Sequence, residues 1–323
     1  MILANDAEFH EPPANEPLWA ETNYFGFEIP QASAHIGLYS LFRPNLGVVN
    51  STVFANSRKV NAGWEIDYWD HRAYLPIKDQ PLTNFALDNG LKVICREPNR
   101  IWDISFHNDV ALDVDVTFEA LMPPFDMHDP EMNPRAKRKG TDLSAAPLWA
   151  GGHFDMTGKV TGEVTLRGSR YDVDWLSTMD HSWGVRGEYQ PGTMTWLQAH
   201  FSRDLAVHAM FQFDPTVPQD QPLDLELTHG FVMQNGKVFG LKSGTGRTER
   251  KGLYQVQTIL DLVDKDDREW HLVGDSITQF PAEYWPGSMS MMVMKKWRMN
   301  DETGYGTSTD FYDYSHFAGL FPN

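Results

Sequence analysis

The chain has 323 residues, of which 41% are hydrophobic and 13% aromatic, which is enough for a substantial core in one large or two smaller domains. Its 44 acidic and 27 basic residues give a net charge of −17. This charge argues against binding nucleic acid, whose phosphates need a basic surface, and against docking on an anionic membrane.

Cys95 is the single cysteine, so no intrachain disulfide is possible. The N-terminal sequence "MILANDAEFHEPPANEP" has neither a basic start nor a sustained apolar run, and no window approaches the roughly 18 apolar residues of a membrane-spanning helix. These features predict a cytoplasmic protein that does not insert into membranes.

Strand patterns run along most of the chain. In "VALDVDVTFEAL" (110–121), Leu112, Val114, Val116 and Phe118 alternate with polar residues, as in a half-buried antiparallel strand. Turn sequences such as "LDNG" (87–90) and "QNGK" (234–237) separate such runs. The pattern predicts an all-β protein of more than a dozen strands, which must close or stack to protect their edges.

Two segments depart from this pattern. Residues 123–147 are rich in proline and charge, which indicates a long surface loop between a first and a second series of strands. Residues 308–321, "STDFYDYSHFAGLF", could form a short helix.

Familiar cofactor signatures are missing. The sequence has no His-Glu-x-x-His, no paired Cys-x-x-Cys, no P-loop and no Gly-x-Gly-x-x-Gly after a strand. The 12 histidines form no pair with helical metal-binding spacing. We therefore expect no metal and no other cofactor.

The stretch "TMDHSWGVRG" (178–187) concentrates groups that suit chemistry. If it is extended, His181 and Trp183 point to one side, and Asp180 points to the other. An imidazole can transfer protons near neutral pH, and an indole can stabilise a cation or pack an apolar ligand. We expect His181 to line a cavity and Asp180 to pair with Arg186 or with neighbouring backbone. Alternatively, Asp180 and Arg186 lock a joint between two sheets while Trp183 fills the core.

A second group lies in "TWLQAHFSRDLAVHAMFQF" (195–213), the sequence of a hairpin. Trp196 and His200 share one face of its first strand, and His208 and Met210 share one face of its second. These side chains could line a ligand pocket, or they could form the solvated outer face of a sheet.

The run "GHFDMTGKVTGEVTLRGSRYDVDWLSTMDHSWGVRG" resembles the carotenoid 1,2-hydratase (hydroxyneurosporene synthase) and AttH-like superfamily, especially its uncharacterised bacterial members. "EPLWAETNYFGFEIP" and "GLYSLFRPN" extend the resemblance over most of the chain. It implies two lipocalin-like antiparallel β-barrel domains packed together, which we place at residues 1–178 and 179–323. It also implies an apolar ligand, which we expect near the contact of the two domains.

The resemblance also implies site residues. In the hydratases, a His-x-Trp pair works with a later Tyr-x-Asp pair whose aspartate donates the proton. His181 and Trp183 match the first pair, but no Tyr-x-Asp follows them, and the nearest form is Phe311-Tyr312-Asp313. Asp313, or Asp310, could be an acid whose pKa is raised by apolar surroundings. Both could also be ordinary surface acids.

We therefore expect a cofactor-free lyase, isomerase or cyclase that performs acid–base chemistry on a hydrophobic, isoprenoid- or polyketide-like small molecule. His181 would be the acid–base group, Trp183 a cavity wall, and Asp180 and Arg186 their supports. A non-catalytic carrier of an apolar metabolite is the alternative, and a scaffold without a ligand is a third possibility. The sequence leaves the substrate, the reaction direction and the oligomeric state open.

Overall fold

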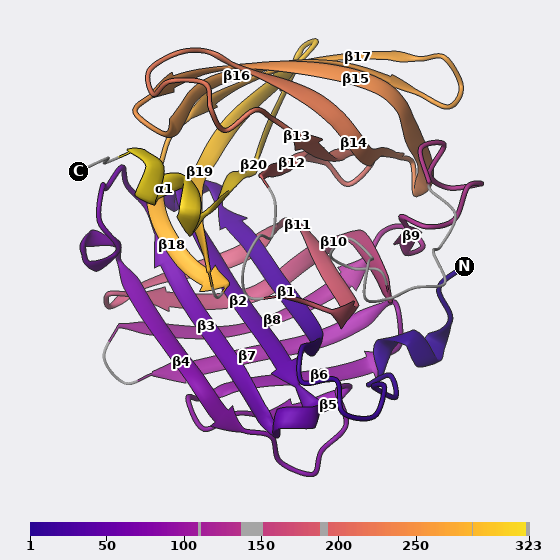
Figure 1. Ribbon diagram of the computed structural model, residues 1–323, viewed down its shortest axis with the longest axis vertical. Coiled ribbons are helices and arrows are strands. Elements are labelled where there is room, and N and C mark those ends of the chain that lie inside the picture. The colour runs from indigo at the N-terminus through magenta and orange to yellow at the C-terminus, as the bar shows by residue number, and fades with distance from the viewer. Residues whose placement is uncertain (109–110, 137–150, 188–192, 286, 321–323) are drawn as a thin grey trace. The chain divides into compact units, whose positions relative to one another are not determined.

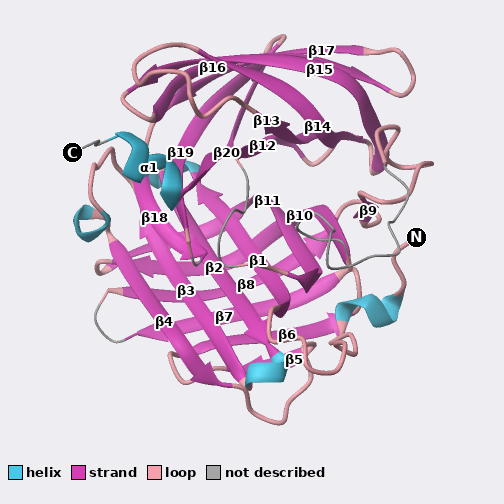
Figure 2. Cartoon of the chain, in the orientation of Figure 1, coloured by secondary structure: helices cyan, strands magenta, loops and turns pink. Residues whose placement is uncertain are grey.

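The computed structural model describes residues 1–108, 111–136, 151–187, 193–285 and 287–320. Antiparallel strands dominate it and form an 11-stranded and a 9-stranded sheet (Figure 1, Figure 2). The chain divides into two compact units, each built around one sheet. Unit 1 contains Met1–Asn56, Asp67–Asp129 and a segment that ends at Arg186. Unit 2 contains Ser57–Ile66, a segment that begins at Pro130, and the chain from Gly187 onward.

The sheet of unit 1 has the strand order β4-β3-β2-β1-β11-β10-β8-β7-β6-β5, and β9 pairs with β10. Apolar side chains from these strands gather in one core, which includes Phe25, Leu38, Phe118 and Phe154. The strands are β1 (Trp19–Ile29), β2 (Ala34–Arg43), β3 (Val48–Asn56), β4 (Tyr68–Pro76), β5 (Asn84–Ala86), β6 (Leu91–Glu97), β7 (Ile101–Asn108), β8 (Leu112–Ala120), β9 (Phe125–Asp126), β10 (Gly152–Leu166) and β11 (Ser169–Val185).

The sheet of unit 2 closes on itself. Its strand order is β17-β16-β15-β14-β13-β12-β20-β19-β18, and an additional pairing of β17 with β19 completes a ring of eight strands. A barrel of about eight strands has an interior that side chains fill or that holds one small ligand. The strands are β12 (Met194–Ser202), β13 (Leu205–Gln212), β14 (Leu223–Gln234), β15 (Lys237–Lys251), β16 (Tyr254–Asp264), β17 (Glu269–Ser276), β18 (Phe280–Trp285), β19 (Ser288–Met299) and β20 (Glu302–Asp313).

The strands and turns follow the local sequence patterns that predicted them. On β8, Leu112, Val114, Val116 and Phe118 are buried, and each residue between them is more exposed. The turn between β14 and β15 is made by Asn235–Gly236, whose φ angles of 51° and 73° suit an asparagine–glycine pair. The all-β class and the two-domain lipocalin-like architecture are therefore confirmed.

The expected domain boundary between residues 178 and 179 stays a prediction. It falls inside β11, and the compact unit 1 continues to Arg186. Helices are short: η1 (Ala4–Ala7), η2 (Pro30–Ala32), η3 (Pro44–Leu46), η4 (Gly63–Glu65) and α1 (Tyr314–Leu320). The helix predicted within residues 308–321 is α1, which begins after β20 ends at Asp313.

No helix in the described part of the chain is both long and apolar enough to span a membrane. Within the predicted surface loop, β9 occupies Phe125–Asp126, and residues 137–150 lie outside the described residues.

Candidate active site

His181 and Trp183 lie on β11 and point to the same side of the unit 1 sheet, as the alternation of the strand predicts. The register places His181 opposite Asn23 of β1 and Phe154 of β10, and it places Trp183 opposite Glu21 of β1. The rings of His181 and Trp183 are 5.2 Å apart, and the Phe154 ring is 5.6 Å from His181. Both predicted side chains are therefore buried beside the aromatic core of unit 1.

Hydrogen bonding fixes the tautomer of His181. Its Nδ1 lies 2.8 Å from the carbonyl oxygen of Thr22, which can only accept, so Nδ1 carries the hydrogen. Burial lowers the pKa of His181 to about 3, and the ring is neutral near pH 7. Its Nε2 therefore presents a lone pair, and among the described residues it has no hydrogen-bond partner. The His181 ring is buried, as expected for a side chain kept from bulk solvent. The expectation that it lines a cavity stays a prediction.

Glu21 faces this lone pair. Its Oε2 lies 3.7 Å from His181 Nε2, and its side chain is fully buried. Burial raises the pKa of the Glu21 carboxyl, although hydrogen bonds from His10 and from Trp19 Nε1 oppose the effect. Glu21 was not among the residues predicted from the sequence. Strict alternation along β1 could have revealed it, because Glu21 is the one carboxyl residue on the strand face that also carries Phe25.

His10, in the N-terminal segment, contacts both Glu21 and Trp183. Its backbone N–H donates to Glu21 Oε1 at 2.6 Å, and its Nδ1 lies 3.2 Å from Glu21 Oε2. Its ring stacks on the indole of Trp183 with centroids 3.9 Å apart. The half-buried His10 thus covers the outer side of the Glu21 carboxyl and the Trp183 indole.

These side chains are also the group that could hold a metal ion. Among the described residues, one ligand atom each from His10, Glu21 and His181 lie within 4.8 Å of one another. Two imidazoles and a carboxylate are a donor set that zinc and iron use. In the structure the carboxylate oxygens already accept hydrogen bonds from His10, and a metal ion would have to replace the bond from its Nδ1.

Asp180 and Arg186 lie on the opposite face from His181. Arg186 is buried, and it donates through Nη2 to Ser182 Oγ, which also bonds Thr22 Oγ1 at 2.7 Å. Burial lowers the pKa of Arg186 to about 10, while the nearby Asp180 carboxylate favours its charged form. This arrangement suits the predicted role of support, and a direct Asp180–Arg186 pair stays a prediction.

Four of the remaining predicted residues share one face of unit 2. Trp196 pairs with Met210 across β12 and β13, and the rings of Trp196 and His208 are 5.3 Å apart. His200 and His208 have no exposed area, and Trp196 and Met210 are also buried. The role of this face as a ligand pocket stays a prediction. These residues belong to unit 2, whereas His181 and Trp183 belong to unit 1.

Asp313 and Tyr312 have structural contacts at the end of β20. Asp313 Oδ1 accepts the backbone N–H of Ser315 at 2.7 Å, which is how a helix N-cap stabilises a first turn. Tyr312 is buried in the core of unit 2, and Arg250 Nη1 donates to its hydroxyl at 3.4 Å. The buried acid of this stretch is Asp310, whose pKa burial raises to about 6.

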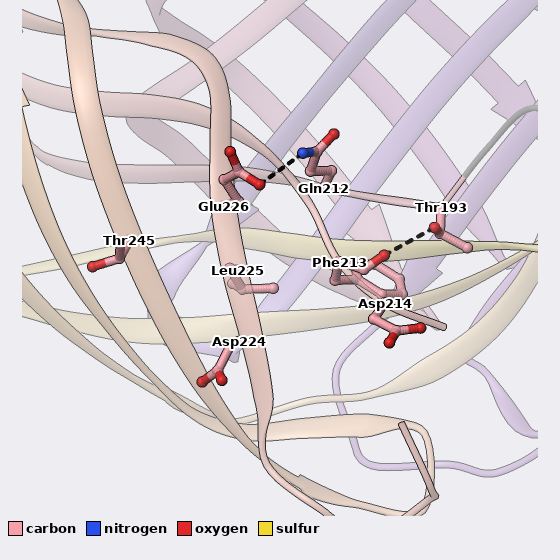
Figure 3. Close-up of a pocket in the computed structure, with 8 residues that line it drawn as sticks. All are labelled: Thr193, Gln212, Phe213, Asp214, Asp224, Leu225, Glu226 and Thr245. Atoms are coloured by element: carbon pink, nitrogen blue, oxygen red, sulfur yellow. Dashed lines mark hydrogen bonds between the residues drawn. The ribbon is translucent and has the colours of Figure 1, made fainter. Parts of the chain in front are cut away.

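A cavity of about 620 Å³ lies in unit 2 (Figure 3). Gln212 donates to Glu226 at 2.8 Å on its wall, and Thr193 donates to the carbonyl of Phe213 at 3.1 Å. None of the predicted site residues lines it. Its three carboxylates are a poor match for an apolar ligand. The lining residues are Thr193, Gln212, Phe213, Asp214, Asp224, Leu225, Glu226 and Thr245.

Solved structures share this fold at low sequence identity. A structure of CghA with Sch210972 matches with a TM-score of 0.54 and 12% identity, over 91% of this chain and 88% of that one. Kievitone hydratase from Nectria haematococca matches with a TM-score of 0.53 and 12% identity, over the same shares of the two chains. A protein assigned as AttH (NE1406) from Nitrosomonas europaea matches with a TM-score of 0.50 and 12% identity, over 92% and 93%.

The two-domain lipocalin-like fold that the resemblance implied is thus shared with these solved structures. No curated protein matches the chain. A family model matches residues 4–314, and the chain therefore belongs to the family described as a domain of unknown function, DUF7064.

Proposed function

We propose that this protein is a cofactor-free acid–base enzyme of the lyase, isomerase or cyclase type that acts on a hydrophobic small molecule. The observation that supports this most is the pair of buried groups in unit 1. The Glu21 carboxyl, with a raised pKa, lies 3.7 Å from the lone pair of a neutral His181. Two titratable groups with pKa values displaced in opposite senses form a proton donor and a proton acceptor.

Hydration of an alkene illustrates the chemistry. Glu21 gives its proton to one alkene carbon, and the cation forms beside the aromatic side chains around His181, which stabilise positive charge. Water adds to the cation, and its surplus proton passes to His181 Nε2. Transfer of that proton from His181 back to Glu21 restores both groups, so the net reaction adds one water to one double bond. Loss of a proton from a neighbouring carbon to His181 would give isomerisation instead.

The shared fold supports this class of reaction. One solved neighbour is named a hydratase, and another was solved with the small molecule Sch210972. We propose the same general kind of chemistry for this chain, with an isoprenoid- or polyketide-like substrate. An apolar substrate also agrees with the aromatic side chains around His181.

The test is isotope incorporation. The protein is incubated in D₂O, and separately in H₂¹⁸O, with a panel of isoprenoid alkenes and polyketide-derived dienes, and the products are read by mass spectrometry. Glu21→Gln keeps the shape of the side chain but cannot donate the proton, so incorporation should fall by about 10²-fold or more. Exposed Glu269 offers the matched control, Glu269→Gln, which should retain incorporation.

Full incorporation by a folded Glu21→Gln protein would refute the proposal. Tight binding of a panel member without any incorporation would identify a carrier instead.

A further inference from the structure

The interior of the unit 2 barrel contains a lysine that the proposed function does not use. Lys295 lies on β19, opposite Gly306 of β20, and has no exposed area. Its neighbours on the same face of β19 are Val293 and Trp297, which are also fully buried. Gly306 is packed closely against β12, because a Cβ on it would lie 2.2 Å from the backbone oxygen of Gln198.

The ammonium of Lys295 has few partners. Among the described residues, its Nζ makes one hydrogen bond, to Ser276 Oγ of β17 at 3.1 Å, and no ion pair. The Trp297 ring lies 5.8 Å away. An ammonium has three hydrogens to donate, so this lysine is poorly satisfied as a cation. Native proteins pair almost all buried charges, and burial of an unpaired lysine favours its neutral form, which is the nucleophilic one.

Unsatisfied polar groups continue along the same interior face. Asp310 lies on β20, and its Oδ1 accepts hydrogen bonds from Thr195 and Gln255, each at 2.6 Å. Asp310 Oδ2, Ser308 Oγ and Trp297 Nε1 are buried without a hydrogen-bond partner among the described residues. Buried polar atoms rarely stay unsatisfied, so ordered water or the polar part of a ligand would complete the hydrogen bonds on this face.

The charges around Lys295 favour its neutral form. Burial lowers its pKa to about 7. The charged groups that act on it are Asp310 of β20 and Asp275 of β17, which raise the pKa, and Lys59, which lowers it. Asp275 is itself bonded to Gln257 and Arg298, which limits its effect on the lysine.

We propose that the unit 2 barrel is a covalent binding site for a carbonyl compound, in which Lys295 Nζ forms an imine with an aldehyde group on an apolar chain. The apolar side chains of the barrel core, which include Leu260, Leu262 and Val232, would contact the chain. This site is independent of the Glu21–His181 pair, which lies in the sheet of unit 1.

The reaction balances without a co-reactant. The Nζ lone pair attacks the carbonyl carbon, and the carbon–oxygen π bond breaks to give a carbinolamine. Both hydrogens of the neutral amine then leave with the carbonyl oxygen as one water, and a carbon–nitrogen double bond remains. Asp310, whose pKa is raised to about 6, lies on the neighbouring strand opposite Met291, and it would carry protons in the dehydration step.

The test is reductive capture in the full-length native protein. The protein is mixed with limiting hexanal and sodium cyanoborohydride at pH 7, and the alkylated lysines are located by peptide mass spectrometry. Lys296 is the internal control, because it is the next residue in the chain and is exposed. At pH 7, about half of an amine with a pKa near 7 is neutral, against about one in 2,500 for an ordinary lysine.

Lys295 should therefore be captured at least about tenfold faster than Lys296 even if entry to the barrel slows it. Lys296→Arg should leave this capture unchanged, and Lys295→Arg should abolish it. The ratio of the two rates should shrink as the pH rises toward 10, because exposed lysines then also become neutral. Native protein in which Lys295 is unmodified, or is modified no faster than Lys296, would overturn the proposal. That result would leave the Glu21–His181 proposal intact, because isotope incorporation does not depend on Lys295.

Discussion

We expect the free energy of unfolding of the His181→Gln protein to fall less than that of the wild type when the pH is lowered. Burial lowers the pKa of His181 from 6.5 to about 3, so the folded state keeps the ring neutral while the unfolded chain binds a proton below about pH 6.5. Between pH 3 and 6.5 the unfolded state therefore binds more protons than the folded state. Stability falls as the pH falls through this window and is unaffected by His181 above it.

The size of the effect follows from the same pKa values. Each pKa unit corresponds to about 1.36 kcal/mol, so lowering the pH from 6.5 to 5 costs about 2 kcal/mol through His181. The ceiling, reached near pH 3, is about 5 kcal/mol. For a domain of about 150–250 residues, a loss of about 2 kcal/mol lowers the melting temperature by roughly 4–8 °C.

The assay compares urea unfolding of the wild type, His181→Gln and His107→Gln at pH 7 and pH 5. Glutamine keeps a donor for the Thr22 carbonyl but cannot titrate. His107 is the control because its side chain is 63% exposed. The wild type and His107→Gln should each lose about 2 kcal/mol more than His181→Gln between the two pH values. An equal loss in all three proteins would refute the reasoning.

Three further predictions test other parts of the account. Because the proposed chemistry needs only protons, dialysis against a chelator should leave isotope incorporation and the melting temperature unchanged, whereas a loss that added Zn²⁺ restores would reveal a metal enzyme. Asp313→Ala should cost about 1 kcal/mol by removing a helix cap and should leave incorporation unchanged, so lost incorporation would return Asp313 to the role of proton donor. Gly152→Ala should destabilise by about 1–3 kcal/mol in urea unfolding, because its Cβ would lie 2.1 Å from the Trp183 ring, and unchanged stability would contradict this packing.

The strands were predictable because their signals are local. The alternation of Leu112 to Phe118 and the Asn235–Gly236 turn each lie within a few residues, and both appear in the structure as expected. The order of the strands was not predictable in the same way. The pairing of β1 with β11, and of β17 with β19, joins segments that are separated by other strands in the sequence.

Part of the candidate site was predictable because its signals are local, and part was not because it depends on long-range strand pairing. His181 and Trp183 fall within one motif, and strand alternation alone puts them on one face. Glu21 is remote in the chain, and only the register between β1 and β11 brings it opposite Trp183. Asp313 looked like a candidate acid because aromatic residues surround it in the sequence, yet its carboxylate accepts a backbone N–H of α1. Aromatic neighbours in sequence do not show which way a side chain points.

The central claim is that Glu21 and His181 form a proton donor and acceptor, and the titration of Glu21 tests it most directly. The measurement is a ¹³C NMR titration of protein labelled at glutamate Cδ, with Glu21→Gln used to assign the Glu21 signal. Because burial raises its pKa, Glu21 should titrate at a clearly higher pH than a glutamate in a model peptide, whose pKa is about 4.3. His181→Gln should move the Glu21 midpoint. A Glu21 midpoint at or below that of the exposed glutamates, unchanged in His181→Gln, would contradict the account.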